Sequence, residues 1–267
     1  RLLISEGDNV VTSDGAYPTF NYHVNGFGGN LHKVPYLDDR EDIVSLIKKA
    51  QSVDAKLIYF ANPDNPMGTH VLGDKIVEAL KDLPDGCLFI LDEAYSEFAP
   101  AASLPKLEIT DERVVRLRTF SKAYGMAGAR VGYAMAEENL IKSFEKIRNH
   151  FGMNRLAQKA ACEALSDDQW LLEMVQKVEN GRQRIYKIAA SNNLKPIASS
   201  TNFVAIDCGK DGGYAGKVLT ELISLGIFVR MPFVSPQDRC IRISVGKERD
   251  LDKFETALPI ALEQASK

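Results

Sequence analysis

Three short apolar runs, each ending in polar residues, constrain the fold of this chain more than any other feature. They are KLIYFANPDNPMG (56–68), CLFILDEAY (87–95) and VVRLRTFSK (114–122), and they recur about every 30 residues. Between the first two, apolar residues of segment 70–86 recur at helical spacing. Strands that alternate with helices form βαβ units, and buried parallel strands are continuous apolar runs. The sequence therefore predicts an α/β fold with a mainly parallel sheet.

The pattern changes in the second half of the chain. From about residue 137 to residue 193 it is almost wholly helical. Strand-like NFVAIDC (202–208) follows, then a helix, then strand-like IFVRM (227–231) and CIRISVG (240–246), and a closing helix. This order predicts a small α+β domain after a helical connector.

We therefore expect two domains. Residues 1–165 are predicted to form a three-layer large domain around the parallel sheet, and residues 166–267 to form the smaller C-terminal domain. The chain opens at Arg1 without a methionine or a helix cap, so the large domain is expected to be incomplete at its N-terminus.

Composition excludes several classes of protein. The net charge of −3 gives no basic surface for nucleic acid, and no apolar run is long enough for a membrane span. The four cysteines are far apart and form no zinc-binding or disulfide pattern, which is typical of a reducing cytoplasm. We expect a cytoplasmic enzyme or regulator without a metal site and with small-molecule partners.

Polar side chains of complementary chemistry follow the three predicted strands. In open α/β sheets, ligands bind at the carboxyl ends of the strands, so these side chains are expected on one rim of the sheet. Each alone has an ordinary explanation: a proline-rich turn, a capping carboxylate, a packing tyrosine or a solvated lysine. They are Asn62, Asn65, Asp92, Glu93, Tyr95, Thr119, Ser121 and Lys122.

Together these residues match the chemical needs of pyridoxal phosphate. Lys122 offers an amine that can form an imine, and Asp92 offers an acid for the ring nitrogen, which must stay protonated to act as an electron sink. Arg130 lies among glycines and alanines, where a guanidinium can bind a phosphate or a structural carboxylate.

Three segments carry a resemblance to a known family. ANPDNPMG (61–68), LDEAYSEF (91–98) and RTFSKAYGMAGARVGY (118–133) resemble the signature segments of fold-type I pyridoxal-phosphate aminotransferases of class I/II. LDEAYSEF and CIRISVG (240–246) are most similar to the histidinol-phosphate aminotransferase branch.

The resemblance implies roles at the cofactor ring. Lys122 would hold the cofactor as an imine and move the substrate proton, and Asp92 would pair with the ring nitrogen. Asn65 and Tyr95 would bond the ring oxygen, and Tyr17 in DGAYPTF would stack on the ring.

The resemblance also implies phosphate and substrate ligands. Thr119, Ser121 and Arg130 would bind the cofactor phosphate. Arg242 would bind the substrate α-carboxylate beside Asn65, and Arg230 would touch a distal acidic group.

The sequence departs from the family in two ways. Met67 stands where a threonine is usual, next to the proline that follows the ligand Asn65. The family's glycine-rich phosphate loop and the tyrosine from a neighbouring subunit have no counterpart in the sequence.

The expected reaction is ping-pong transamination between an amino acid, or an amine such as histidinol phosphate, and a 2-oxo acid. A lyase or decarboxylase of the same fold and a pyridoxal-phosphate-sensing regulator remain as alternatives. The resemblance implies a homodimer, and the sequence leaves the amino donor open.

Overall fold

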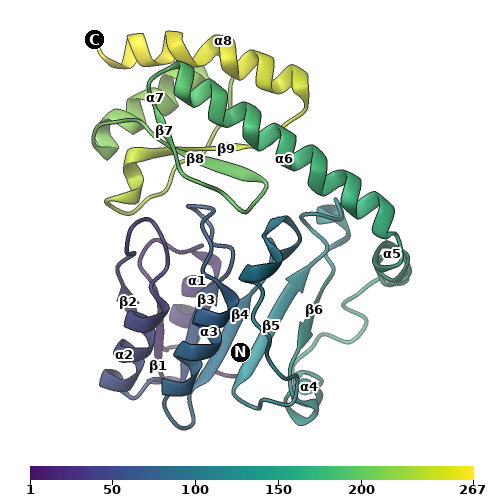
Figure 1. The fold of residues 1–267 in the computed structure, drawn as a ribbon. Helices are drawn as coiled ribbons and strands as arrows, with labels where there is room; N and C mark the ends of the chain where they lie inside the picture. Colours follow the sequence, from purple (N-terminus) through teal and green to yellow (C-terminus); the bar gives the residue numbers. More distant parts are fainter.

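The computed structural model describes residues 1–267 and contains two β-sheets connected by a long helix (Figure 1). The first sheet has six strands in the order β2-β1-β3-β4-β5-β6, and only the edge strand β6 is antiparallel to its neighbour. Its strands are β1 (Asn9–Ser13), β2 (Asn30–Val34), β3 (Leu57–Ala61), β4 (Leu88–Asp92), β5 (Val114–Thr119) and β6 (Gly132–Met135).

The three apolar runs form neighbouring parallel strands, as predicted. They are β3, β4 and β5, and in the register Asp92 lies opposite both Ala61 and Leu117. The carboxyl ends of these strands therefore lie at one edge of the sheet, which brings the residues that follow them together.

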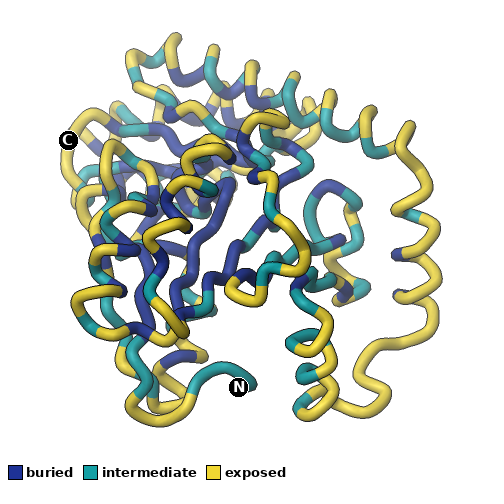
Figure 2. Tube along the Cα trace, turned by 60° about the horizontal axis from the view of Figure 1, so that its bottom comes forward, coloured by how far each residue is buried: buried dark blue, intermediate teal, exposed yellow.

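Helices cover both faces of this sheet. The apolar cluster on one face includes residues of α2 (Ile43–Val53) and α3 (Gly73–Ala79), and the cluster on the other face includes residues of α1 (Thr19–Gly26) and α4 (Glu138–Phe144). Figure 2 shows the buried strands in dark blue and the outer helix surfaces in yellow. The three-layer α/β prediction is confirmed.

The helix α2 illustrates how sequence sets an element. The Asp42 side chain accepts hydrogen bonds from the backbone N–H groups of Val44 and Ser45, which otherwise have no partner at a helix start. The helix ends at Asp54, which adopts a left-handed conformation with φ 50°. Its apolar face packs on the sheet through Ile43, Leu46, Ile47 and Ala50.

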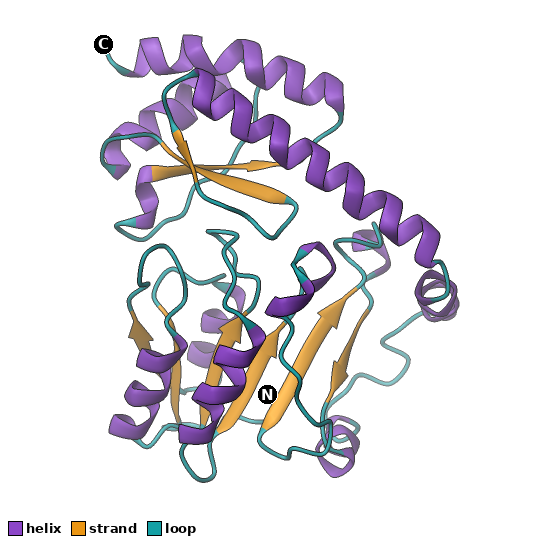
Figure 3. Ribbon diagram, viewed as in Figure 1, coloured by secondary structure: helices purple, strands orange, loops and turns teal.

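The second sheet is small and antiparallel, and it is covered by helices on one side (Figure 3). Its strands are β7 (Lys195–Pro196), β8 (Phe203–Asp207) and β9 (Cys240–Ser244), and its helices are α7 (Gly212–Ser224) and α8 (Glu248–Ala265). The helical segment predicted before it consists of α4, α5 (Arg155–Leu165) and α6 (Asp168–Ser191).

One predicted strand is not formed. IFVRM (227–231) contains only an isolated bridge, in which the backbones of Arg230 and Arg242 exchange hydrogen bonds of 3.2 and 2.6 Å. This bridge places the two arginines side by side. None of the helices combines the length and apolarity that crossing a bilayer requires.

Candidate active site

Asp92 ends β4 and lies at the centre of the rim where predicted site residues gather. Tyr59 on the neighbouring strand β3 donates its hydroxyl to Asp92 Oδ2 at 2.5 Å, and the backbone N–H of Ala94 donates to Oδ1 at 3.0 Å. Burial raises the pKa of Asp92, while the hydrogen bonds from Tyr59 and Ala94 and the charge of Lys122 oppose that rise. Asp92 is thus a desolvated carboxylate, held at the rim of the sheet by two hydrogen bonds.

Lys122 lies in the turn after β5. Its Nζ is 5.1 Å from the centre of the Tyr95 ring, and it makes no ion pair with a carboxylate. Burial lowers the pKa of Lys122, Tyr17 and Asp92 raise it, and Arg242 and Arg130 lower it further. An amine with a lowered pKa is a better nucleophile and proton acceptor near neutral pH.

The Tyr95 ring is fixed beside this amine. It packs edge-on against Phe203 of β8, with ring centres 5.4 Å apart, and burial raises the pKa of its hydroxyl. Tyr95 therefore stays protonated and can donate a hydrogen bond. Tyr17, just before α1, is half exposed and acts electrostatically on both Lys122 and Tyr95, so it borders the same space.

The residues predicted to bind phosphate line one hollow of about 390 Å³ between the ends of β5 and β6. Thr119, Ser121 and Arg130 all face it. Arg130 has a left-handed backbone (φ 54°) and donates to the carbonyl of Ala127 at 2.9 Å, with no carboxylate partner. Within this chain Arg130 has no structural carboxylate partner, which favours the phosphate as its ligand.

Arg242 and Asn65 bring the two sheets together. Arg242 Nη1 donates to Asn65 Oδ1, and its guanidinium carbon lies 4.7 Å from the centre of the Phe203 ring. Burial lowers the pKa of Arg242, Tyr95 raises it, and Arg230 lowers it further. Arg230 itself is exposed and lies over Phe228, 5.6 Å from the ring centre.

Sequence reasoning missed three residues around this site. Tyr59 lies inside an apolar strand, and nothing in LIYFA distinguishes its hydroxyl from a packing group. Glu41 and Asp64 are buried behind Asn65. Nothing in NPDNP marks Asp64 as buried, because aspartate is an ordinary turn residue.

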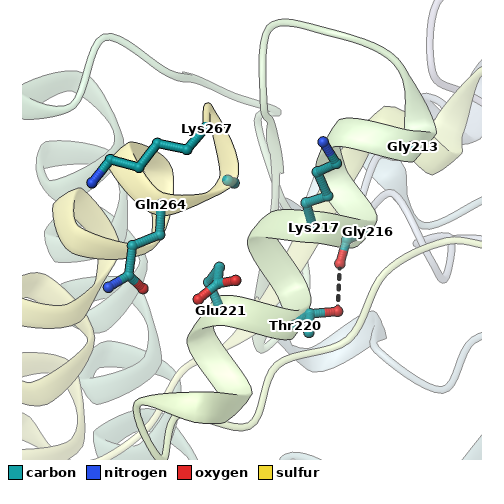
Figure 4. Close-up of a pocket in the computed structure, with 8 residues that line it drawn as sticks. Gly213, Gly216, Lys217, Thr220, Glu221, Gln264 and Lys267 are labelled. Atoms are coloured by element: carbon teal, nitrogen blue, oxygen red, sulfur yellow. Dashed lines mark hydrogen bonds between the residues drawn. The ribbon is translucent and has the colours of Figure 1, made fainter.

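A second hollow, of about 500 Å³, lies between α7 and α8 (Figure 4). Its wall is formed by surface side chains such as Lys217, Glu221 and Gln264. None of the predicted site residues lies there.

The chain belongs to the class I and II aminotransferases. The model of this family matches residues 1–258. The histidinol-phosphate aminotransferase of Geobacillus sp. (strain WCH70) is 32% identical over 268 residues, which is 99% of this chain and 72% of that protein. A second relative of that name, from Carboxydothermus hydrogenoformans, is 34% identical and also matches over 72% of its length.

Solved structures agree with this assignment. The histidinol-phosphate aminotransferase of Sinorhizobium meliloti, solved in complex with pyridoxal-5'-phosphate, superposes with a TM-score of 0.96 at 50% identity, over 98% of this chain and 72% of that one. An aspartate aminotransferase variant from Thermus thermophilus shares the fold, with a TM-score of 0.85 at 20% identity, over 98% of this chain and 75% of that one. The predicted family, fold class, enzyme class and cofactor are confirmed at the level of the family.

Proposed function

We propose that this chain binds pyridoxal phosphate through the predicted site residues and transfers the amino group of a donor similar to histidinol phosphate. The observation that carries the proposal is Lys122, a desolvated amine without an ion pair that lies over the Tyr95 ring and whose charge acts on the buried carboxylate of Asp92. The names of the relatives support the donor class.

The residues fit the cofactor. A buried carboxylate needs a cationic partner, and a protonated ring nitrogen is one. Thr119, Ser121 and Arg130 offer hydroxyls and an unpaired guanidinium to a phosphate in a hollow of about 390 Å³. Asn65 and Tyr95 supply the hydrogen-bond donors that a ring oxygen requires.

When bound, pyridoxal phosphate supplies an aldehyde that captures amines and a protonated ring that withdraws electrons. The protein's own contribution is proton control and positioning. Lys122 Nζ, with its pKa lowered by burial, would take the proton from the substrate's Cα. It would then return this proton to the carbon that was the aldehyde carbon of the cofactor. Asp92 stays ionised next to a cation, and Tyr59 orients it.

Arg242 is proposed to hold the substrate carboxylate. Retention of that carboxylate favours transamination over decarboxylation, because a bidentate guanidinium stabilises the intact group. Arg230, brought beside Arg242 by the backbone bridge, is proposed to hold a distal phosphate.

We also propose the domain organisation, the oligomeric state and the location of the protein. Residues 1–165 would bind the cofactor, and residues 166–267 would form the small domain.

Exposed apolar side chains before and on α5 and α6, namely Phe151, Leu156 and Leu172, support a homodimer, which light scattering can measure. Free cysteines support a cytoplasmic location, and fractionation of cells tests it.

The test of the function uses purified protein and added cofactor. Wild type should gain the visible absorbance of lysine-bound pyridoxal phosphate and lose it when histidinol phosphate is added, then regain it with a 2-oxo acid. Lys122→Ala should show neither change. Arg230→Gln should raise KM for phosphorylated donors about tenfold or more and leave neutral donors nearly unaffected. Undiminished amino transfer by Lys122→Ala would overturn the proposal.

A further inference from the structure

Two buried carboxyl groups lie directly behind the site, and the proposed mechanism uses neither. Glu41, just before α2, is 3% exposed, and Asp64, in the turn after β3, is 2% exposed. The two carboxyl groups lie close enough to act on each other, because the charge of Asp64 raises the pKa of Glu41 and Glu41 lowers the pKa of Asp64. Two carboxylates in contact in a dry interior repel strongly, so such a pair holds a proton between them.

Glu41 joins the ends of two strands. Its Oε2 accepts a hydrogen bond of 2.8 Å from the hydroxyl of Ser13 at the end of β1. Its Oε1 accepts a bond of 3.2 Å from the backbone N–H of Ala61 at the end of β3. Glu41 therefore links the two strands whose ends carry Tyr17 and Asn65.

Asp64 closes the turn that carries Asn65. Its Oδ1 accepts from the Tyr36 hydroxyl at 2.7 Å, and its Oδ2 accepts from the Met67 backbone N–H at 2.9 Å. The Asp64 backbone N–H donates to the Thr69 carbonyl, and the Asp64 carbonyl accepts from the Gly68 N–H, so Asp64 holds the turn through both its side chain and its backbone.

The hydrogen bonds favour Asp64 as the ionised member of the pair. Each carboxyl accepts two of them, but those to Asp64 are 2.7 and 2.9 Å long and those to Glu41 are 2.8 and 3.2 Å long. Burial raises the pKa of Asp64 to about 6 and raises the pKa of Glu41 further above its usual range. The other ionisable groups that face the pair are Tyr36 and Tyr59, whose pKa values burial also raises, and Asp92, Tyr95 and Arg242 beyond them.

We propose that Glu41 and Asp64 form a one-proton pair, in which the protonated Glu41 donates to the Asp64 carboxylate, and that this pair positions Asn65 for cofactor and substrate. The role in positioning rests on the proposed function. Glu41 and Asp64 touch neither ligand and act through the turn. Asn65 in turn meets Arg242, and Met67 is completely buried against the small domain through Ile197, Ala205 and Cys240. Displacement of the turn would therefore move ligands from both sheets.

Four variants distinguish the shared proton of the pair from the role of the pair in positioning Asn65. Glu41→Gln keeps a donor toward Asp64 and an acceptor for Ala61, so it should preserve the turn while removing the protonated acid. Asp64→Ala removes the acceptor for Met67 and Tyr36. Asp64→Asn keeps an oxygen for Met67 but presents N–H groups toward Glu41, which should then give up its proton. Asp38→Asn removes an exposed carboxylate from the same loop and serves as the control.

Three measurements read these variants. Infrared difference spectra between wild type and each variant at pH 7 detect the carbonyl stretch of a protonated carboxyl. The rate of amide hydrogen exchange at Met67 in cofactor-free protein measures how firmly the turn is held. Absorbance titration gives the dissociation constant of pyridoxal phosphate. We expect the infrared signal in wild type and Asp38→Asn and its loss in Glu41→Gln and Asp64→Asn. We expect Asp64→Ala to speed exchange at Met67 and to weaken cofactor binding about tenfold, with Glu41→Gln within about twofold of wild type.

Each contrary outcome overturns a stated part of the proposal. An infrared signal that persists in Glu41→Gln would place the proton elsewhere, and one that persists in Asp64→Asn would show that it is not shared. Unchanged exchange and cofactor affinity in Asp64→Ala would remove the positioning role. If Asp64→Ala does not fold, Asp64→Asn decides through the infrared signal, and its exchange and affinity should remain close to wild type. Failure of wild type to bind the cofactor would count against the proposed function alone, because infrared and exchange need no ligand.

Discussion

Tyr59 donates its phenol hydrogen to Asp92 across two neighbouring strands, at 2.5 Å between Tyr59 Oη and Asp92 Oδ2. The ring of Tyr59 is stacked on Phe20, with ring centres 4.3 Å apart, so the hydroxyl has little freedom to leave. This hydrogen bond stabilises the ionised form of a carboxylate whose pKa burial raises.

Tyr59→Phe should therefore raise the pKa of Asp92 further. Because the proposed role needs ionised Asp92, activity at the acidic end of the pH profile should fall, by about tenfold, and recover as pH rises. Profiles of kcat/KM against pH measure this shift. Tyr214→Phe, which removes a hydroxyl bonded to Leu262 and Ser266 in the small domain, is the control. An acidic limb that does not move in Tyr59→Phe would contradict the role of this bond.

Arg242→Lys should weaken the use of the amino donor more than the binding of the cofactor. Lysine keeps the charge but loses the planar, two-pronged geometry that matches a carboxylate. We expect kcat/KM for the donor to fall about ten- to hundredfold, with the cofactor dissociation constant nearly unchanged. Steady-state kinetics and absorbance titration measure the two quantities. Equal losses in both would show that Arg242 acts on the cofactor site as a whole.

Gly68→Ala should destabilise the protein more than Gly86→Ala. Both glycines have left-handed backbones, with φ of 78° and 75°, and share the cost of about 1–2 kcal/mol for a side chain there. A Cβ on Gly68 would also lie 2.6 Å from Ser199 Oγ, whereas a Cβ on Gly86 would meet nothing within 4 Å. The extra loss of unfolding free energy for Gly68→Ala should be about 1–3 kcal/mol, measured by urea denaturation. Equal losses would show that Ser199 moves aside freely.

Arg182→Met and Arg184→Met form a second matched pair. Arg182 is buried in α6 and donates to the carbonyls of Ser199 and Thr201 at 2.8 and 3.2 Å, besides pairing with Glu179. Its loss leaves these two carbonyls without a donor and should lower the unfolding free energy by about 2–4 kcal/mol. Arg184 pairs with acidic groups on α8 at the surface, and its loss should lower the unfolding free energy by about 1 kcal/mol or less. Comparable losses in thermal or urea unfolding would be evidence against a structural role for the buried guanidinium.

The sequence was sufficient to predict which residues follow the carboxyl ends of adjacent strands and therefore lie at a common edge of the sheet. Apolar runs identify β3, β4 and β5, and the rule for parallel sheets then brings Asn65, Asp92 and Lys122 together without any long-range information. The helix–strand alternation and the strands of the small antiparallel sheet follow from the same periodicities.

The sequence could not predict contacts that depend on the packing of distant segments. The Tyr59 hydroxyl has the same local pattern as a packing ring, and Glu41 meets Asp64 only once α2 is docked on the sheet. The strand predicted for 227–231 was wrong because its apolar residues favour a strand locally, but only Arg230 finds a backbone partner on β9.

The contact between Arg242 and Asn65 has a consequence for how one asparagine serves two ligands. The Asn65 Oδ1 accepts from a single N–H of the guanidinium, so the positive charge and the other donors of Arg242 remain free for a carboxylate. The amide N–H groups of Asn65 remain free as donors at the same time. Under the proposed function, Asn65 would therefore connect the arginine of the substrate site to the ring of the cofactor, and a change at this one residue would alter the binding of both.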